Sequence, residues 1–386
     1  MGCNDSLRSV AEPVLGLLSR FLVSQTLILG LCGPLWAADR VAVSAERFLS
    51  SLGVIPHIDQ GVSAASYIEP LRYLGVRNIR DGMRNSSQVE LIQRETGVRL
   101  DLFCQGGLDV CLASARKLAK SGALMAIEGP NEPNNFPIVY DGQPGGGMGS
   151  WVPVARFQEA LYGAVKSDPD LHDYPVFAVS ESGAEIDNVG LQFLTIPADA
   201  NAALPEGTRF ADYANTHNYV SSTRSLYLDN QAWNAADPAL NGPLDGVFGN
   251  CSITWRYHFQ GYPSARLQTL PRVTTETGWD SVSGIGGERT QGTVLVNTYL
   301  AQFKRGWRYT FIYQLRDGEG GSGNQGLFHP DSTPKLAATY IHNLTSVLAD
   351  DRPIGSPGYL NYSIIGDRAR SAAAKEQWSL RARDLG

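Results

Sequence analysis

The sequence predicts an α/β fold built around a parallel sheet, and two observations support this. Short β-prone segments alternate with segments of helical periodicity along the 386-residue chain, which is the order typical of parallel strands joined by helices. Eight such alternations over about 300 residues match the size of a (β/α)8 TIM barrel with insertions. An open doubly wound sheet is the alternative, but it needs a glycine-rich fingerprint after the first strand, and residues 58–61 do not provide one.

The expected strands are short and mostly apolar. They cover residues 54–58, 76–82, 98–104, 123–127, 174–180, 210–220, 270–276 and 309–315. Between them, capping-box spacing predicts helices opening at Ser66 and Ser87, and periodicity predicts helices over 108–120, 151–166 and 288–304. Pro334 is expected at the first position of a last helix, with one apolar face formed by Leu336, Tyr340, Leu344 and Val347.

Three segments have the composition of loops. Residues 141–150 and 317–324 are rich in glycine. The first lacks the Gly-Lys-Ser/Thr ending of a phosphate-binding loop, so both are expected at the rim of the barrel. Residues 221–262 form a long irregular region with Trp233, Trp255 and Tyr257, and long loops in compact domains usually serve function.

Composition narrows the choice of partner. The formal net charge is −6, 43 % of residues are hydrophobic and 18 % are charged, as in a globular protein with a sizeable core. Because no basic run offsets the negative charge, the sequence argues against nucleic acid or an anionic membrane as partner. Oligomeric state does not follow from the sequence.

The N-terminal segment resembles a signal peptide. Arg8 and Arg20 precede an apolar run that ends at small residues before Asp39, so residues 1–38 are expected to be removed on export. The run is short and broken for a membrane anchor, so we expect a secreted or periplasmic protein without stable membrane insertion after cleavage. A Cys104–Cys111 bridge with Cys251 left over is possible, and buried free thiols are an equal alternative. No His/Cys spacing suggests a metal site, and no cofactor is expected.

Two glutamates follow predicted strands. Glu132 lies in Gly129-Pro130-Asn131-Glu132-Pro133, where the prolines end the strand because they lack an N–H. Glu276 ends its strand in Thr275-Glu276-Thr277-Gly278-Trp279. Parallel strands of a barrel end at one face, where such barrels carry their chemistry. We therefore expect the two acids to converge, although Glu132 taken alone is equally well explained as a solvated turn residue.

Convergent carboxyl groups suit the cleavage of a glycosidic bond. One must be protonated to donate to the leaving oxygen, and the other ionised to attack the anomeric carbon or activate water. Other strand-end residues could assist. Asn131 could bind a sugar hydroxyl, Arg80 could keep Glu276 ionised, His217 or Tyr219 could orient Glu276, and Trp279 and Tyr313 could form a stacking floor. An ion pair between Arg80 and Glu128 inside the barrel is an equally plausible role for that arginine, and Glu181 and Asp81 are rival carboxylates.

These motifs, in this order, resemble clan A of the glycoside hydrolases, near bacterial members of the xylosidase/iduronidase and exopolysaccharide endo-glycosidase branch. The resemblance covers residues 48–350, which we expect to form the catalytic barrel. It implies a retaining hydrolase acting on O-glycosidic, β-linked bonds of an oligo- or polysaccharide through a covalent glycosyl-enzyme, with Glu132 as acid/base and Glu276 as nucleophile. Arg80, Asn131 and Tyr219 match the clan's positions around the reacting centre.

The sequence departs from the clan in two places. Strand eight often presents a tryptophan there, whereas this chain has Tyr313-Gln314. Relatives often continue into a small β-sandwich, of which residues 359–365 could be the first strand, but residues 351–386 are otherwise expected to be a truncated or disordered tail. A carbohydrate-binding protein on the same scaffold, without catalysis, is the alternative function. A lyase or aldolase would need a lysine or metal cluster at the strand ends, which the sequence does not suggest.

Overall fold

The computed structural model describes residues 40–133, 135–147, 149–180, 207–217, 219, 270–282, 286–304, 306–320, 323–349 and 359–360. The chain divides into two compact units, one formed by Ser44–Pro353 with Ala382–Gly386 and the other by Met1–Val43 with Ile354–Arg381. The predicted signal peptide 1–38, the region 221–262, Cys251, Glu181 and all but two residues of the segment 351–386 lie outside the described residues.

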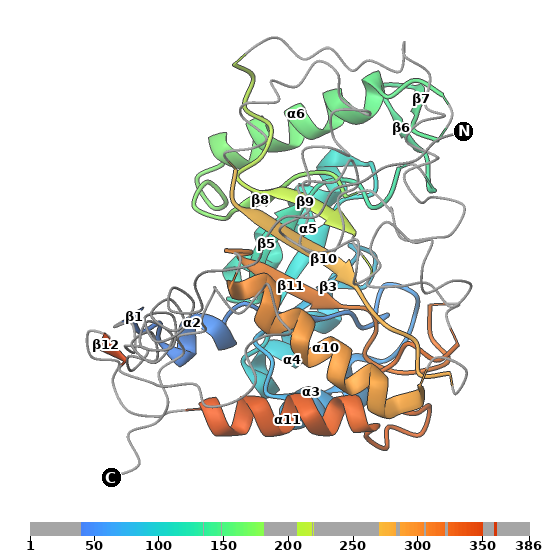
Figure 1. Ribbon diagram of the computed structural model, residues 1–386. Helices are drawn as coiled ribbons and strands as arrows, with labels where there is room; N and C mark the ends of the chain where they lie inside the picture. Colours follow the sequence, from blue (N-terminus) through green and yellow to red (C-terminus); the bar gives the residue numbers. More distant parts are fainter. Residues whose placement is uncertain are drawn as a thin grey trace, which may run out of the picture. The chain divides into compact units, whose positions relative to one another are not determined.

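The larger unit is a parallel β-barrel with helices around it (Figure 1). Its strands are β2 (Leu52–Val54), β3 (Asn78–Asp81), β4 (Arg99–Phe103), β5 (Leu124–Glu128), β8 (Val176–Phe177), β9 (Ala214–His217), β10 (Arg272–Thr277) and β11 (Tyr309–Ile312). The order in the sheet is β8-β5-β4-β3-β2-β11-β10-β9, and all neighbouring strands are parallel. Each strand therefore lies beside the one that precedes or follows it in the barrel, and β2 lies beside β11. A parallel bridge between Phe177 and Tyr213 joins the two ends and closes the barrel. The predicted (β/α)8 fold is confirmed.

The strand positions follow from backbone chemistry. β5 is buried at every residue, as expected for a strand covered on both faces, and it stops before Pro130. β2 begins two residues earlier than predicted and ends four residues earlier, at Val54, because Pro56 lacks an N–H and cannot continue the ladder. Side chains of β5, β8, β10 and β11 meet in an apolar cluster that contains Met125, Phe177, Val273 and Phe311.

The helices around the barrel include most of those predicted. They are α2 (Ala45–Leu49), η1 (Ala64–Tyr67), α3 (Ile68–Leu74), η2 (Ser86–Gln88), α4 (Val89–Thr96), α5 (Leu108–Lys120), α6 (Val152–Ser167), α10 (Gly287–Lys304) and α11 (Leu336–Leu348). Both predicted capping boxes are wrong, because a 3-10 turn precedes α3 and α4 and neither helix receives a side-chain cap.

The predicted start of the last helix is also wrong. Pro334 pairs with Phe328 in an isolated bridge, and α11 begins two residues later with Lys335 as its N-cap. Its buried residues are Ala337, Ala338, Ile341 and Thr345, whereas Leu336 and Val347 are exposed. The prediction from apolar periodicity assigned the larger side chains to the buried face of this helix. Because α10 lies close to α11, mostly small side chains are buried there instead. A Cβ on Gly292 of α10 would meet the Tyr340 ring at 2.6 Å.

Part of the first glycine-rich segment has regular structure. Strands β6 (Ile138–Tyr140) and β7 (Gln143–Gly145) pair as an antiparallel hairpin. Asp141 and Gly142 form its two-residue turn with φ of 50° and 71°, the positive values that a type I′ turn requires. The Asp-Gly pair was the sequence signal for this hairpin, which the prediction of a rim loop missed.

In the smaller unit, the described residues form one antiparallel pair. β1 (Arg40–Val41) pairs with β12 (Tyr359–Leu360), so that Arg40 lies opposite Leu360. β12 falls at the start of the predicted strand 359–365. Across both units, none of the described helices combines the length and the apolar character needed to cross a bilayer.

Candidate active site

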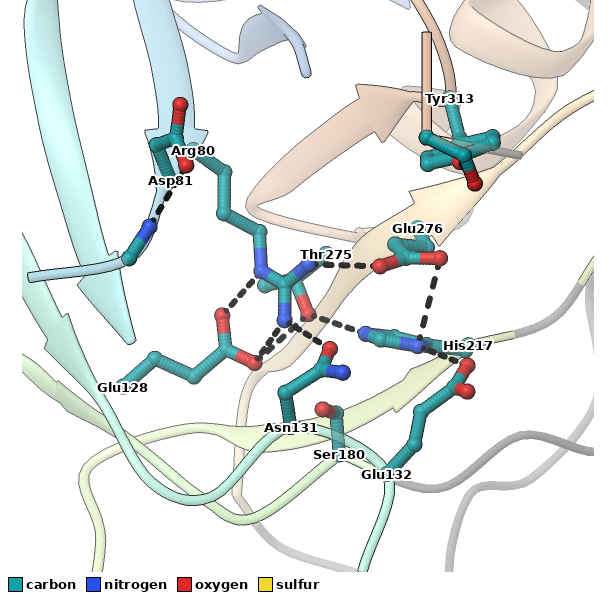
Figure 2. Close-up of polar contacts among 12 residues, drawn as sticks. Arg80, Asp81, Glu128, Asn131, Glu132, Ser180, His217, Thr275, Glu276 and Tyr313 are labelled. Carbon is teal, nitrogen blue, oxygen red and sulfur yellow. Dashed lines mark hydrogen bonds and ion pairs between the residues drawn. The ribbon is translucent and has the colours of Figure 1, made fainter. Parts of the chain in front are cut away.

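Glu132 and Glu276 come from opposite parts of the sequence and meet at the ends of the barrel strands. Glu132 lies four residues beyond the end of β5, and Glu276 is the next-to-last residue of β10. A carboxylate oxygen of Glu132, one of Glu276 and a ring nitrogen of His217 all lie within 4.8 Å of one another. The predicted convergence of the two acids is therefore present in the structure, and Figure 2 shows both side chains pointing toward His217.

Arg80, from β3, connects Glu276 with the interior of the barrel. Nη1 donates to Oε1 of Glu276 at 2.7 Å, and Nε and Nη2 donate to the two oxygens of Glu128 at 2.7 and 2.8 Å. Nη2 also donates to Oδ1 of Asn131 at 2.7 Å. Both roles considered for this arginine are thus realised together. Burial lowers the pKa of Arg80, but the charges of Glu128 and Glu276 outweigh it and raise that pKa.

Glu276 has a second partner, Tyr219, whose hydroxyl donates to Oε2 at 2.6 Å. Burial, followed by the charge of Glu276, raises the pKa of Tyr219 well above its ordinary value, so the phenol keeps its proton and acts as a donor. The close approach of Tyr219 to Glu276 depends on Gly278, because a Cβ at that position would lie 2.5 Å from the Tyr313 carbonyl and 3.2 Å from Cε1 of Tyr219. Glu276 thus accepts one hydrogen bond from a charged donor and one from a neutral donor, on its two different oxygens.

Glu132 has a different environment. Nδ1 of His217 lies 2.6 Å from its Oε1, and Nδ2 of Asn135 donates to Oε2 at 3.0 Å. The same Nδ1 is 3.6 Å from Oε2 of Glu276. His217, expected to orient Glu276, therefore contacts Glu132 more closely. Burial raises the pKa of Glu132, but the hydrogen bonds with His217 and Asn135 outweigh it and hold the pKa below its usual range.

The contacts of Nε2, the second ring nitrogen of His217, indicate where the proton shared by His217 and Glu132 lies. Nε2 lies 3.0 Å from Oγ1 of Thr275, which in turn lies 3.2 Å from Glu128 and 3.0 Å from Oδ1 of Asn215. A hydroxyl has one proton to donate. When Thr275 gives it to Glu128 or Asn215, it accepts from His217 Nε2–H. The 2.6 Å contact then holds a single proton between Nδ1 and the Glu132 carboxylate.

The side chains of the two acids are more exposed to solvent than those of the residues that hold them. The side chains of Glu132 and Glu276 keep 10 and 12 % of their accessible surface, whereas those of Arg80, Glu128 and His217 keep 1 % or less. Solvent therefore reaches the two glutamates more readily than it reaches these three supporting groups. Glu128 is a buried counter-ion. Burial raises its pKa, but Arg80 outweighs burial and lowers it.

Tyr313 and Trp279, the two residues predicted to form a stacking floor, have different surroundings. The ring of Tyr313 lies edge-on to that of Tyr219, with 6.3 Å between centroids, and edge-on to His57 at 5.4 Å. Trp279 is buried, and within the described residues no hydrogen bond or ring contact joins it to the two acids. Asp81, the rival carboxylate, accepts from the backbone N–H groups of Ile58 and Gly82, which ties it to the loop after β2.

The Glu132, His217 and Glu276 donors also form the type of group that can bind a metal ion, although no ligand spacing indicated one in the sequence. Two ligands of a tetrahedral zinc ion lie about 3.3 Å apart for metal–ligand distances of about 2.0–2.1 Å. His217 Nδ1 and Glu132 Oε1 lie closer, at 2.6 Å, which is the separation of a hydrogen bond. The described geometry is thus that of a proton-sharing pair.

The residues absent from the sequence-based site include Asn135 and Asn215. They also include Gln105, which hydrogen-bonds to the Asn131 backbone, and Asp101, a buried carboxyl group that interacts with Glu128. Gln105 and Asn135 lie just past the ends of β4 and β5, so the rule that found Glu132 could have found them. Asn215 and Asp101 lie within strands that read as ordinary β segments. Their inward direction depends on barrel register, which the sequence alone does not give.

Comparison with known proteins bears on the fold. No model of a protein family matches the chain, and neither does any curated protein. A family 39 glycoside hydrolase from the gut symbiont Bacteroides cellulosilyticus WH2 has a similar structure, with a TM-score of 0.51 and 16 % sequence identity. The match covers 80 % of this chain and 65 % of that one, so this chain spans just under two thirds of its length.

GH5_18 from Streptomyces cattleya, solved in complex with GlcNAc, is also similar, with a TM-score of 0.50 and 10 % identity. That match covers 81 % of this chain and 82 % of the other. The likeness establishes a barrel fold shared with these proteins, as the motifs around Glu132 and Glu276 led us to expect.

Proposed function

We propose that the protein is a retaining glycoside hydrolase that cleaves β-linked O-glycosidic bonds in an oligo- or polysaccharide. The observation that carries the proposal is the convergence of Glu132 and Glu276 at one end of the barrel, with oxygens within 4.8 Å. Carboxyl groups about 5–5.5 Å apart are typical of retaining enzymes, whereas inverting enzymes leave a wider gap for water. The fold shared with glycoside hydrolases agrees with this function.

The different surroundings of the two acids support different roles. Arg80 and Tyr219 each donate a hydrogen bond to Glu276, which holds that carboxylate in a fixed position, as a nucleophile requires. In the first step a Glu276 oxygen bonds to the anomeric carbon as the glycosidic C–O bond breaks, and the leaving oxygen takes the proton held between Glu132 and His217. In the second step Glu132 accepts a proton from water, which attacks the glycosyl ester and releases Glu276.

Neighbouring side chains suit the binding of the sugar. The Asn131 amide, whose oxygen accepts from Arg80, has an N–H₂ group that can donate to the 2-hydroxyl, a contact that strengthens in the transition state of such reactions. Tyr313 offers a partly buried ring beside Tyr219, and we propose it and Trp279 as stacking surfaces for the ring that is cleaved. We further propose export of the protein, because Cys104 and Cys111 form a disulfide and disulfides persist in oxidising compartments.

The function can be tested with a panel of β-linked aryl glycosides and polysaccharides. The wild type should hydrolyse at least one member, and Glu276→Gln and Glu132→Gln should each lose most of that turnover. A 2-deoxy-2-fluoro glycoside of the preferred sugar should add one glycosyl group to the peptide that contains Glu276, as detected by mass spectrometry. Sugar binding by calorimetry without turnover or label would instead favour a carbohydrate-binding protein.

A further inference from the structure

The turn that carries Glu132 has an unfavourable backbone conformation. Glu132 has φ of 42°, in the left-handed region that residues with a Cβ rarely adopt. Such a conformation persists only where the surrounding structure fixes it. Pro130 and Pro133 flank the turn and lack N–H groups, so they offer only their carbonyls, which accept from the N–H groups of Ser180 and Gly147 at 3.2 and 2.8 Å. Within the turn, the N–H groups of Asn135 and Phe136 donate to the Glu132 carbonyl at 2.8 and 2.7 Å.

One side chain from another loop binds both ends of this turn. Oε1 of Gln105 accepts from the backbone N–H of Asn131 at 2.8 Å. Its Nε2 donates to the Asn131 carbonyl at 3.0 Å and to the Phe136 carbonyl at 3.1 Å. The carboxamide thus makes three hydrogen bonds, all to the backbone of the two residues that bracket the acid. Both the donor and the acceptor of the side chain are used, which is a geometry that only an amide provides.

Gln105 is itself held in place. It follows Cys104, which is bonded to Cys111 in the first turn of α5. The Cys104 N–H donates to the Glu128 carbonyl at 3.0 Å, which extends the pairing of β4 with β5. The loop that presents the carboxamide is therefore anchored at one end by the barrel and closed by a disulfide across its base.

We propose that Gln105 is a positioning residue for Glu132, holding the strained turn so that the carboxyl group can deliver its proton to the leaving oxygen. The inference rests on the proposed function, in which Glu132 is the acid/base. Proton transfer requires a donor–acceptor distance of about 2.6–3.2 Å, and a displacement of about 1 Å can lower the rate about 100-fold. The side chain at 105 contacts only the turn, so its loss affects the step that needs the proton. The Asn131 side chain keeps its own hydrogen bond from Nη2 of Arg80 at 2.7 Å, so attack by Glu276 is spared.

The dependence of rate on the leaving group tests this role. Gln105→Ala should lower kcat/KM by about 10- to 100-fold for unactivated glycosides, such as methyl or phenyl glycosides or the natural oligosaccharide. For 2,4-dinitrophenyl glycosides, which leave without a proton, kcat/KM should stay within about twofold, and fluoro-glycoside labelling of Glu276 should keep the wild-type rate. Azide, which attacks the glycosyl-enzyme without a general base, should raise the variant's kcat on the dinitrophenyl substrate. Gln143→Ala, which removes an exposed glutamine from β7, is the matched control and should behave like the wild type.

A second variant separates positioning from folding. In Gln105→Glu an ionised carboxylate would face the carbonyls of Asn131 and Phe136, whereas the protonated acid can donate to one of them. Its activity on unactivated substrates should therefore rise toward that of the wild type as the pH falls, which a damaged fold would not reproduce.

Equal losses on both classes of leaving group, or no loss on either, would overturn the positioning role while the wild-type turnover still upholds the hydrolase. A wild type with neither turnover nor label would overturn the hydrolase assignment and this role with it.

Discussion

Nη1 of Arg80 lies 2.7 Å from Oε1 of Glu276, while the rest of the same guanidinium binds Glu128 and Asn131. The proposed nucleophile is thus held by a cation that is 1 % exposed and shared with a fully buried carboxylate. Because Glu128 balances Arg80 from inside the barrel, the cation stays fixed when Glu276 changes charge during glycosyl transfer. Structural stability and the proposed catalysis therefore depend on the same ion pairs.

Arg80→Met should destabilise the protein strongly. Breaking a buried ion pair by removing one partner costs about 3–5 kcal/mol, and here two carboxylates lose their cation. Arg80 lowers the pKa of Glu128. The stability that this ion pair contributes is therefore present above the pKa of Glu128 in the unfolded chain, about 4.3, and is lost as the pH falls through the pKa of Glu128 in the folded protein. Urea unfolding should therefore give a smaller deficit at pH 4 than at pH 7. The double variant Arg80→Met/Glu128→Gln should lose less than the two single variants together.

Asp101→Asn should have the opposite pH dependence. Asp101 is fully buried, and no donor among the described residues reaches either of its oxygens. Burial, and then the charge of Glu128, raise its pKa well above the ordinary value, which favours the protonated form in the folded state. The stability associated with that proton is complete below the unfolded pKa of about 3.9 and is lost as the pH rises through the folded pKa. Because asparagine stays neutral, the variant should gain stability relative to the wild type between pH 5 and pH 8. Parallel curves in urea unfolding would mean that Asp101 is ionised.

The barrel was predictable because its signals are local. Most strands lie in short β-prone runs closed by proline, glycine or charge, and β4 and β5 lie within a residue or two of the predicted bounds. Glu132 and Glu276 were found the same way, since strand-end acids of a parallel barrel share a face. These signals need only the sequence around each residue.

Contacts between strands were not predictable to the same degree. The partner of His217 could not be chosen between Glu276 and Glu132 from the sequence. The choice depends on strand register, and a register shift between β9 and β10 places His217 opposite Glu276 in the ladder. The support from Gln105 was missed for a related reason, since it depends on how two loops from neighbouring strands pack. Helix starts at Ser66 and Ser87 failed because 3-10 turns took over the role of the capping side chains.

Tyr219→Phe should lower activity while the fold stays intact. The variant loses one hydrogen bond to the proposed nucleophile, and bonds to charged groups contribute about 1.5–3 kcal/mol, so kcat/KM should fall about 10- to 150-fold. The raised pKa of Tyr219 keeps the phenol protonated, so the ratio to wild type should stay constant from pH 5 to pH 9. Tyr162→Phe on α6 is the control, because the hydrogen bond that it removes is the 3.3 Å contact with Asp212 and not a bond to either acid. A ratio that changes with pH would show that the phenol titrates in this range.

Replacing both Cys104 and Cys111 by serine should reduce stability and disturb the acid in particular. A cross-link between residues seven positions apart is expected to contribute about 2–3 kcal/mol through the entropy of the unfolded chain. Because this bridge closes the loop that presents Gln105, the variant should also lose more activity on phenyl than on dinitrophenyl glycosides. A reductant should lower the urea midpoint of the wild type toward that of the variant and leave the variant unchanged. Equal sensitivity of both proteins to the reductant would show that the disulfide does not support this loop.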